Sequence, residues 1–373
     1  MGVGEISVNL GTGPDPYRWW LSGDYLLGFT REANAPTVAS AGPAATGGII
    51  GLAGTRQLTS AMPDFGSISG ARLSGGVWLE DCRAYGLDWS VFFLGRRQAD
   101  STFNAGTGEV LARPFFDTAF NVENSRRISL PGVVSGSVTT NYRTDFWGGE
   151  LGTRLRVIET PTLSVEQLFH FRYYQLDETF TASDTSSALA GGVVAFNGQA
   201  FPAPARVRVT DQYAVTNRFY GGSAGARLLW TPGRWEVRVD GRMGIGAVEQ
   251  NVTLSGSTSL ENAGPTATVP GGFYTNAVNT GVFRSYRLSL APDVTARVGY
   301  RVTDWLMLTA GYQFLYMTNV TRPGDMIVRQ LNSARIPSSQ NFGAAAPGVA
   351  IEPTFISRDF WMHGLTAGLM LTF

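Results

Sequence analysis

The chain has 373 residues, of which 43% are hydrophobic, yet no apolar run reaches the roughly 18 residues that a membrane-spanning helix needs. Its 29 basic residues, all arginine, balance 29 acidic ones, so no nucleic acid or other polyanionic partner is expected. The single cysteine, Cys82, excludes an intramolecular disulfide bond.

Ten segments alternate apolar with small or polar residues at a period of two, which is typical of β-strands. In chain order they are residues 19–29, 71–79, 85–93, 147–157, 163–173, 220–230, 235–245, 286–300, 306–316 and 361–373. Each apolar face is about ten residues long, the length with which a tilted strand crosses a bilayer. These apolar faces contain no Asp, Glu or Arg, whereas the alternate positions carry many. The pattern predicts an all-β fold, a transmembrane antiparallel up-and-down β-barrel.

Aromatic residues stand near both ends of the apolar faces, as expected of the two interfacial girdles of a membrane barrel. The residues predicted to form these girdles and to contact outer-membrane lipid are Trp19, Phe29, Tyr85, Phe93, Trp147, Tyr173, Tyr220, Trp230, Trp235, Tyr316, Trp361 and Phe373. A soluble sandwich also alternates, but its apolar faces would rarely carry aromatics at both ends.

The connections between these segments alternate in length. Short turns are predicted near residues 81–82, 159–161, 231–234 and 303–304, and five long loops near 31–66, 98–140, 177–212, 250–282 and 321–358. Short periplasmic turns with longer extracellular loops are the known asymmetry of such barrels. Ten strands are therefore predicted. Residues 126–140, 205–210 and 251–260 also alternate, and either extend these strands or raise the count to twelve. A bulge is expected at Pro292.

Both ends of the chain bear on the location. The final segment closes on Phe373 and resembles the C-terminal signal of bacterial outer-membrane barrels, which implies the barrel-assembly machinery as a partner. Residues 1–17 are predicted to be a periplasmic segment, followed by a single barrel domain from 18 to 373. No signal peptide is visible, so an outer-membrane location implies that one was removed.

The inward positions concentrate charge, with arginine in excess of acids. The residues predicted to line the lumen are Arg72, Asp88, Glu150, Arg154, Glu166, His170, Arg172, Arg227, Glu236, Arg238, Asp240, Arg242, Arg287, Asp293 and Arg297. Charges this close must pair where water is scarce. Two interpretations stay open: a structural core of ion pairs, or a narrow water-filled path that prefers anions.

Catalysis and metal binding are poorly supported. With one cysteine and two histidines, a transition-metal site is not expected, and no cofactor is predicted. His170 is predicted to face the lumen as a hydrogen-bonding partner, and His363 to face lipid. A single lumen histidine makes a hydrolytic site hard to build, so the protein is not expected to be an enzyme.

Several stretches resemble the putative beta-barrel porin family, type seven. The residues that carry the resemblance are GYQFLYMTNVTRPGD (311–325), RWWLSGDYLLGF (18–29), SGARLSGGVWL (69–79), FFLGRR (92–97), LARPFFD (111–117), FRYYQLDE (171–178) and NRFYGGSAGAR (217–227). The resemblance implies an outer-membrane barrel with a porin role, and no catalytic motif comes with it.

Two functions are therefore predicted. The first is passive diffusion of small hydrophilic solutes through a narrow, arginine-rich lumen. The alternative is a non-conducting barrel that displays its long loops for adhesion or envelope structure. Ten strands lie near the size at which side chains fill a barrel. The strand count therefore does not decide between the two predicted functions. Whether the chain forms a homo-oligomer is left open.

Overall fold

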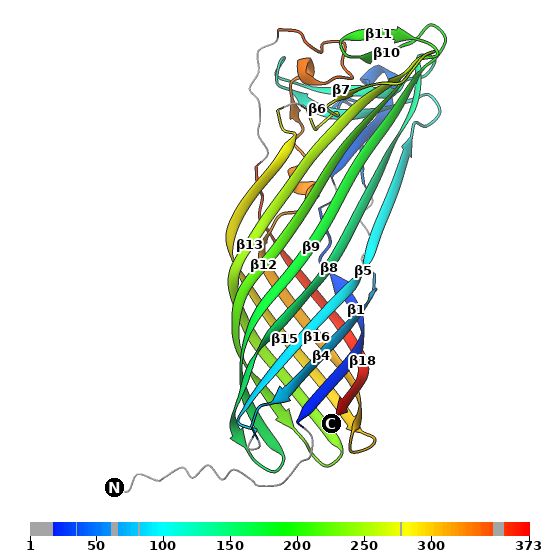
Figure 1. The fold of residues 1–373 in the computed structure, drawn as a ribbon. Coiled ribbons are helices and arrows are strands. Elements are labelled where there is room, and N and C mark those ends of the chain that lie inside the picture. The colour runs from blue at the N-terminus through cyan, green and yellow to red at the C-terminus, as the bar shows by residue number, and fades with distance from the viewer. Residues whose placement is uncertain (1–17, 35, 61–65, 81–82, 277, 346–353) are drawn as a thin grey trace.

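The computed structural model describes residues 18–34, 36–60, 66–80, 83–276, 278–345 and 354–373. Among these residues, ten antiparallel strands close into one ring (Figure 1). The ring strands are β1 (Trp19–Thr30), β4 (Ile68–Trp78), β5 (Tyr85–Asn104), β8 (Val134–Glu159), β9 (Leu163–Ala188), β12 (Arg206–Trp230), β13 (Trp235–Glu261), β15 (Gly281–Arg301), β16 (Leu306–Val320) and β18 (Arg358–Thr372). The all-β, up-and-down fold predicted from the sequence is confirmed.

The ring closes through β1, which pairs with β18 on one side and with β4 on the other. Apart from this closing pair of β1 and β18, neighbouring strands of the ring follow one another in the chain, so no connection crosses another. Four short connections lie at one end of the barrel, where β1 also begins and β18 ends (Figure 1). This end is called the short-turn end. The opposite end, which carries the long connections, is called the loop end.

The wall of the barrel is much taller on one side. β8, β9, β12 and β13 have 25 to 27 residues, whereas β1, β4, β16 and β18 have 11 to 15. Since about ten residues cross a bilayer, the long strands continue well beyond it at the loop end. Residues 206–210 and 251–260 belong to these extensions of β12 and β13, and add no strand to the ring.

The long connections contain more secondary structure than their content of glycine and proline predicts. β2 (Thr37–Pro43), β3 (Arg56–Thr59), β6 (Glu109–Asp117), β7 (Val122–Ser129) and β17 (Gln330–Leu331) form a second sheet at the loop end, here called the cap. The remaining elements are the hairpin of β10 (Val193–Phe196) and β11 (Gln199–Pro202), β14 (Ala267–Pro270) beside β13, and the short helices η1 (Ala44–Thr46), η2 (Pro323–Met326) and η3 (Ser333–Arg335). In the described part of the chain, no helix is long and apolar enough to cross a membrane.

The bulge expected at Pro292 is not present, because β15 keeps an unbroken register with β13 through Met243↔Pro292. Instead, the ladder between β15 and β16 ends at Asp293↔Leu315. Proline has no N–H to donate, so this is where a ladder can stop without losing a bond. Above it, side chains join the two strands: Asn319 Nδ2 donates to the Leu288 carbonyl at 2.7 Å, and Ser289 Oγ to that of Thr318 at 2.7 Å.

The predictions that lie outside the described residues are the N-terminal segment 1–17, Cys82 and the short turn at residues 81–82.

Candidate functional site

The half of the barrel interior nearer the short-turn end is filled by charged side chains, here called the charge layer. Its members come from seven strands and are Asp24, Asp88, Glu150, Glu166, His170, Arg172, Arg227, Asp240, Arg242, Asp293 and Arg297. All project inward because residues of one parity face the same side of a strand.

Arg227 on β12 is the centre of one cluster in the charge layer. In register it lies opposite Glu166 on β9 and Asp240 on β13, and its guanidinium is 3.3 Å and 2.9 Å from their carboxylates. It also reaches Asp88 on β5 at 3.1 Å, three strands away around the ring. His170 Nε2 lies 2.6 Å from the other oxygen of Asp88. One arginine thus joins four strands across the lumen.

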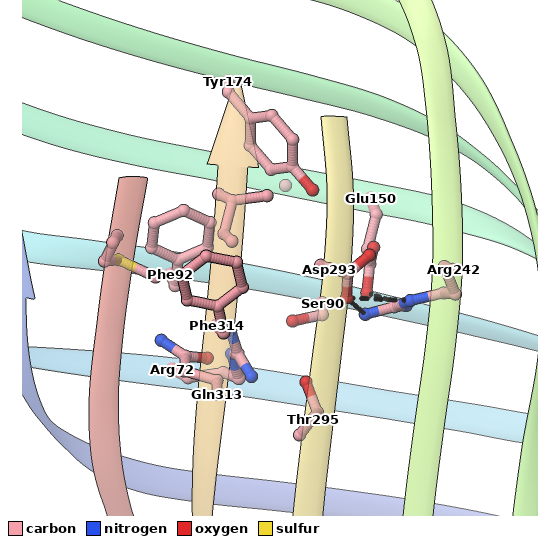
Figure 2. A pocket seen from close by; sticks show the side chains of 13 residues that line it. Arg72, Ser90, Phe92, Glu150, Tyr174, Arg242, Asp293, Thr295, Gln313 and Phe314 are labelled. Carbon is pink, nitrogen blue, oxygen red and sulfur yellow. Dashed lines mark hydrogen bonds and ion pairs between the residues drawn. The ribbon is translucent and has the colours of Figure 1, made fainter. Parts of the chain in front are cut away.

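A second cluster is built on two arginines and two acids. Arg172 lies opposite Glu150 in the β8–β9 pair, and Arg242 opposite Asp293 in the β13–β15 pair. Each arginine also reaches the other pair: Arg172 Nη2 is 2.5 Å from Asp293, and Arg242 Nη1 is 2.7 Å from Glu150. Figure 2 shows Arg242 held between Glu150 and Asp293. These contacts span the lumen from one wall to another.

A third link joins β15 to β1. Arg297 Nη2 donates to Asp24 at 2.7 Å, and Asp24 also accepts a hydrogen bond from Thr309 on β16 at 3.1 Å. The described cavities between the clusters have volumes of about 20 and 30 Å³. Such volumes hold one or two water molecules, far less than a hydrated solute needs.

Above the charge layer the interior changes to rings, here called the aromatic layer: Phe92, Phe146, Tyr174, Phe219 and Phe360. Tyr174 stacks on Phe219 with centroids 5.6 Å apart, and Phe146 meets Phe360 edge-on at 4.8 Å. Figure 2 places Tyr174 and Phe92 beside the second cluster. Packing of this density leaves little room for water.

Two buried ion pairs tie the loop end together. Arg322, just after β16, donates to Glu178 on β9 at 2.6 Å, and Glu178 also accepts from Tyr142 at 2.7 Å. The pair unites two stretches that carried the family resemblance, FRYYQLDE and the TRPGD end of GYQFLYMTNVTRPGD.

The second of these pairs fastens the cap to the barrel. Arg113 of β6 lies 2.7 Å from Asp211 and 3.1 Å from Asp184 and stacks over the ring of Tyr274 at 4.6 Å. Burial lowers the pKa of Arg113, but the two carboxylates outweigh burial, so its pKa is raised and it stays charged.

Two larger cavities lie at the ends of the interior. One, of about 440 Å³, lies at the loop end between the cap, the β10–β11 hairpin and η3. Its walls mix apolar side chains such as Phe115 and Phe273 with the hydroxyls of Ser186, Ser333 and Ser338. The other, of about 150 Å³, opens at the short-turn end and is lined by Trp20, Trp78 and several arginines.

The twelve girdle residues are all on the outward side of the wall, and several pack in pairs, such as Phe93 with Trp147 and Tyr173 with Tyr220. His363 lies among them, stacked on Phe29 at 5.1 Å. Of the predicted lumen residues, fourteen line the charge layer or the cavities next to it.

Arg287 is the exception, because it lines neither the charge layer nor the cavities next to it. It has the inward parity, but it lies above the point at which the β15–β16 ladder ends. At this level β15 pairs only with β13, so the side chain of Arg287 is exposed.

Sequence reasoning missed the inward indoles of Trp20 and Trp78 and the buried charges of the loop end. The indoles share the parity of the lumen arginines, which was a usable signal. Arg113 and Asp184 offered none, because they lie in connections that were treated as loops. Within the described residues, no group of three or more His, Cys, Asp or Glu could hold a metal ion.

Comparisons with known proteins agree with the barrel fold. The model of the family described as "Putative beta barrel porin-7 (BBP7)" matches residues 20–373. No curated protein matches the chain.

Solved structures are similar at low identity. The outer membrane protease OmpT from Escherichia coli is 11% identical, with 96% of this chain and 97% of that chain covered and a TM-score of 0.41. Neisserial surface protein A is 10% identical, with 95% and 97% covered and a TM-score of 0.24. The toluene transporter TodX from Pseudomonas putida is 8% identical, with 98% and 93% covered and a TM-score of 0.21.

Proposed function

This chain belongs to the Putative beta barrel porin-7 family, and we propose that it serves in the bacterial outer membrane as a closed barrel that carries a folded cap outside the cell. In this proposal the short-turn end faces the periplasm and the barrel is an anchor, not a pore or an enzyme. Outer-membrane lipid surrounds the girdles, and the C-terminal strand is recognised by the barrel-assembly machinery.

The observation that carries the proposal is the set of ion pairs that cross the lumen. Asp88 with Arg227, Arg172 with Asp293 and Arg297 with Asp24 each join strands that are three places apart in the ring of ten. A solute would have to break these buried pairs, and each broken pair would leave charges without partners. The aromatic layer adds a second obstruction above them.

The cap supports a role outside the membrane. The tall strands β8, β9, β12 and β13 raise it beyond the bilayer, and the buried pair of Arg113 with Asp211 holds it in one position. Rigid, preorganised surfaces lose less entropy on binding than mobile loops do. A cap of this kind suits adhesion or recognition, and its cavity of about 440 Å³ falls in the size range of small-molecule sites.

Bilayer recording of the purified protein tests the proposal. We expect no steady current at any voltage, in a bilayer that conducts normally when a known porin is added. A stable open-channel current would overturn the closed-barrel proposal.

A second candidate function is diffusion of small anions, favoured by the arginines around the cavity at the short-turn end. It would require the cross-lumen pairs to rearrange. If currents appear, we expect them to prefer anions and to lose part of that preference in Arg238→Ala, which removes a positive charge from the cavity wall.

A further inference from the structure

The cavity at the short-turn end has an uneven supply of hydrogen-bonding groups. Its charged lining includes Arg154, Arg156, Arg227 and Arg238, against the acids Glu166 and Glu236. Its indole lining includes Trp20 and Trp78, which can donate a hydrogen bond but cannot accept one. Donors therefore outnumber acceptors around a space of about 150 Å³.

Glu166 is shared among three guanidinium groups. It lies 3.3 Å from Arg227, 3.7 Å from Arg156 and 4.0 Å from Arg154. Arg227 also has Asp88 and Asp240, and Arg156 has Glu159 at 2.5 Å. Arg154 has only the most distant of these contacts, although its side chain is just 6% exposed. A buried guanidinium with so little compensation is costly.

Four buried donors at this site have no hydrogen-bond partner among the described residues. They are Nε and Nη2 of Arg154, Nε of Arg156 and the indole Nε1 of Trp20. The faces of the indoles compensate Arg154 in part, since its Cζ lies 3.8 Å from the ring of Trp78 and 5.9 Å from that of Trp20. A π-face cannot satisfy an N–H in the plane of the guanidinium.

Two glycines make room for these donors. A Cβ at Gly86 would lie 2.7 Å from Nε of Arg154, and one at Gly76 would lie 2.5 Å from Nε1 of Trp20. Either contact is closer than real side chains allow, so both donors occupy their places only because the wall has no side chain there.

We propose that this cavity is a binding site for a small oxyanion of the phosphate class, held by Arg154, Arg156 and the indole N–H of Trp20. An oxyanion offers negative charge and more acceptor oxygens than donors, which are what the site lacks. Planar guanidinium groups match the oxygens of such an ion. The cavity opens at the short-turn end, so the ion enters from the periplasm. The site requires no conduction and goes beyond the proposed anchoring function.

Isothermal titration calorimetry tests the proposal. Inorganic phosphate is titrated into the whole purified chain in a nonionic detergent, and sodium chloride keeps the ionic strength constant. We expect saturable binding at one site per chain that excess chloride does not abolish. Arg154→Met should remove the binding. Its folding is checked by the altered gel mobility that intact barrels show before heating.

Two milder variants keep the test decisive if Arg154→Met fails to fold. Trp20→Phe keeps an aromatic side chain but removes Nε1, and should weaken phosphate binding about tenfold, as expected for the loss of one hydrogen bond to a charged group. Glu236→Gln removes an acid from the cavity wall and should tighten binding, by about threefold or more.

Arg96→Gln is the matched control. It removes one positive charge from an exposed pair with Asp145, so phosphate affinity should stay unchanged. Absence of saturable phosphate binding to the wild-type chain would overturn the proposal. Equal affinity in the wild type, Trp20→Phe and Glu236→Gln would overturn it as well. Neither result depends on whether the barrel conducts.

Discussion

The charge layer and the aromatic layer fill the same barrel by opposite means. In the lower layer, arginines such as Arg227 meet acids from three other strands. In the upper layer, Phe146, Tyr174 and Phe219 pack ring against ring. Ion pairs need partners at fixed positions, whereas rings tolerate adjustment. The difference suggests that the lower layer fixes which strands face each other and the upper layer excludes water.

The largest expected effect comes from removing the centre of the charge layer. Arg227→Met leaves Asp88, Glu166 and Asp240 buried around an uncharged side chain, and should lower the free energy of unfolding by about 3–5 kcal/mol. Denaturant titration of the reconstituted protein, followed by gel mobility, measures it. Arg96→Met, which breaks an exposed pair, should change little. Similar losses in both variants would show that the buried cluster contributes no more to stability than an exposed ion pair does.

The next effect concerns the outer side of the wall at the level of the charge layer. Val239 is next to Asp240 in the chain but faces outward, and Val239→Arg should cost about 2–4 kcal/mol because the new charge meets lipid. Val282→Arg is the control, since Val282 is also outward and exposed but lies near the loop end of β15. Equal costs at the two positions, measured by the same titration in liposomes, would contradict the assigned membrane level.

A substitution in the aromatic layer should lower the free energy of unfolding less than one in the charge layer. Phe219→Leu keeps most of the buried apolar volume but loses the stack on Tyr174, so we expect a loss of about 1–2 kcal/mol. Denaturant titration again provides the value. A loss as large as that of Arg227→Met would remove the proposed contrast between the two layers.

The smallest effect is expected where side chains replace the β15–β16 ladder. Thr318→Val removes the hydroxyl that accepts from the Leu290 N–H at 3.0 Å, and should cost about 0.5–1.5 kcal/mol. Amide hydrogen exchange should quicken at Leu290 and stay unchanged at Val298, within the paired part of β15. Unchanged exchange at Leu290 would show that these strands are held in another way.

Strand type, the up-and-down order and the facing of most residues could be predicted from the sequence, because a period of two is a local property of the chain. Arg287 shows the limit of this reasoning. Its parity is inward, but its exposure depends on whether β16 continues beside it, which the spacing along β15 does not encode.

The amino-acid sequence by itself determined that charged side chains would lie inside a barrel with an apolar outer surface. Only the tertiary structure decided that Asp88 meets Arg227 and that Arg154 lacks a close acid, because such contacts depend on how the ring closes and how its strands are staggered. The cap was likewise decided in three dimensions. Its sheet places β2 and β17 on either side of β6, and its anchor joins Arg113 to Asp211. These are contacts between remote parts of the chain that no local pattern specifies.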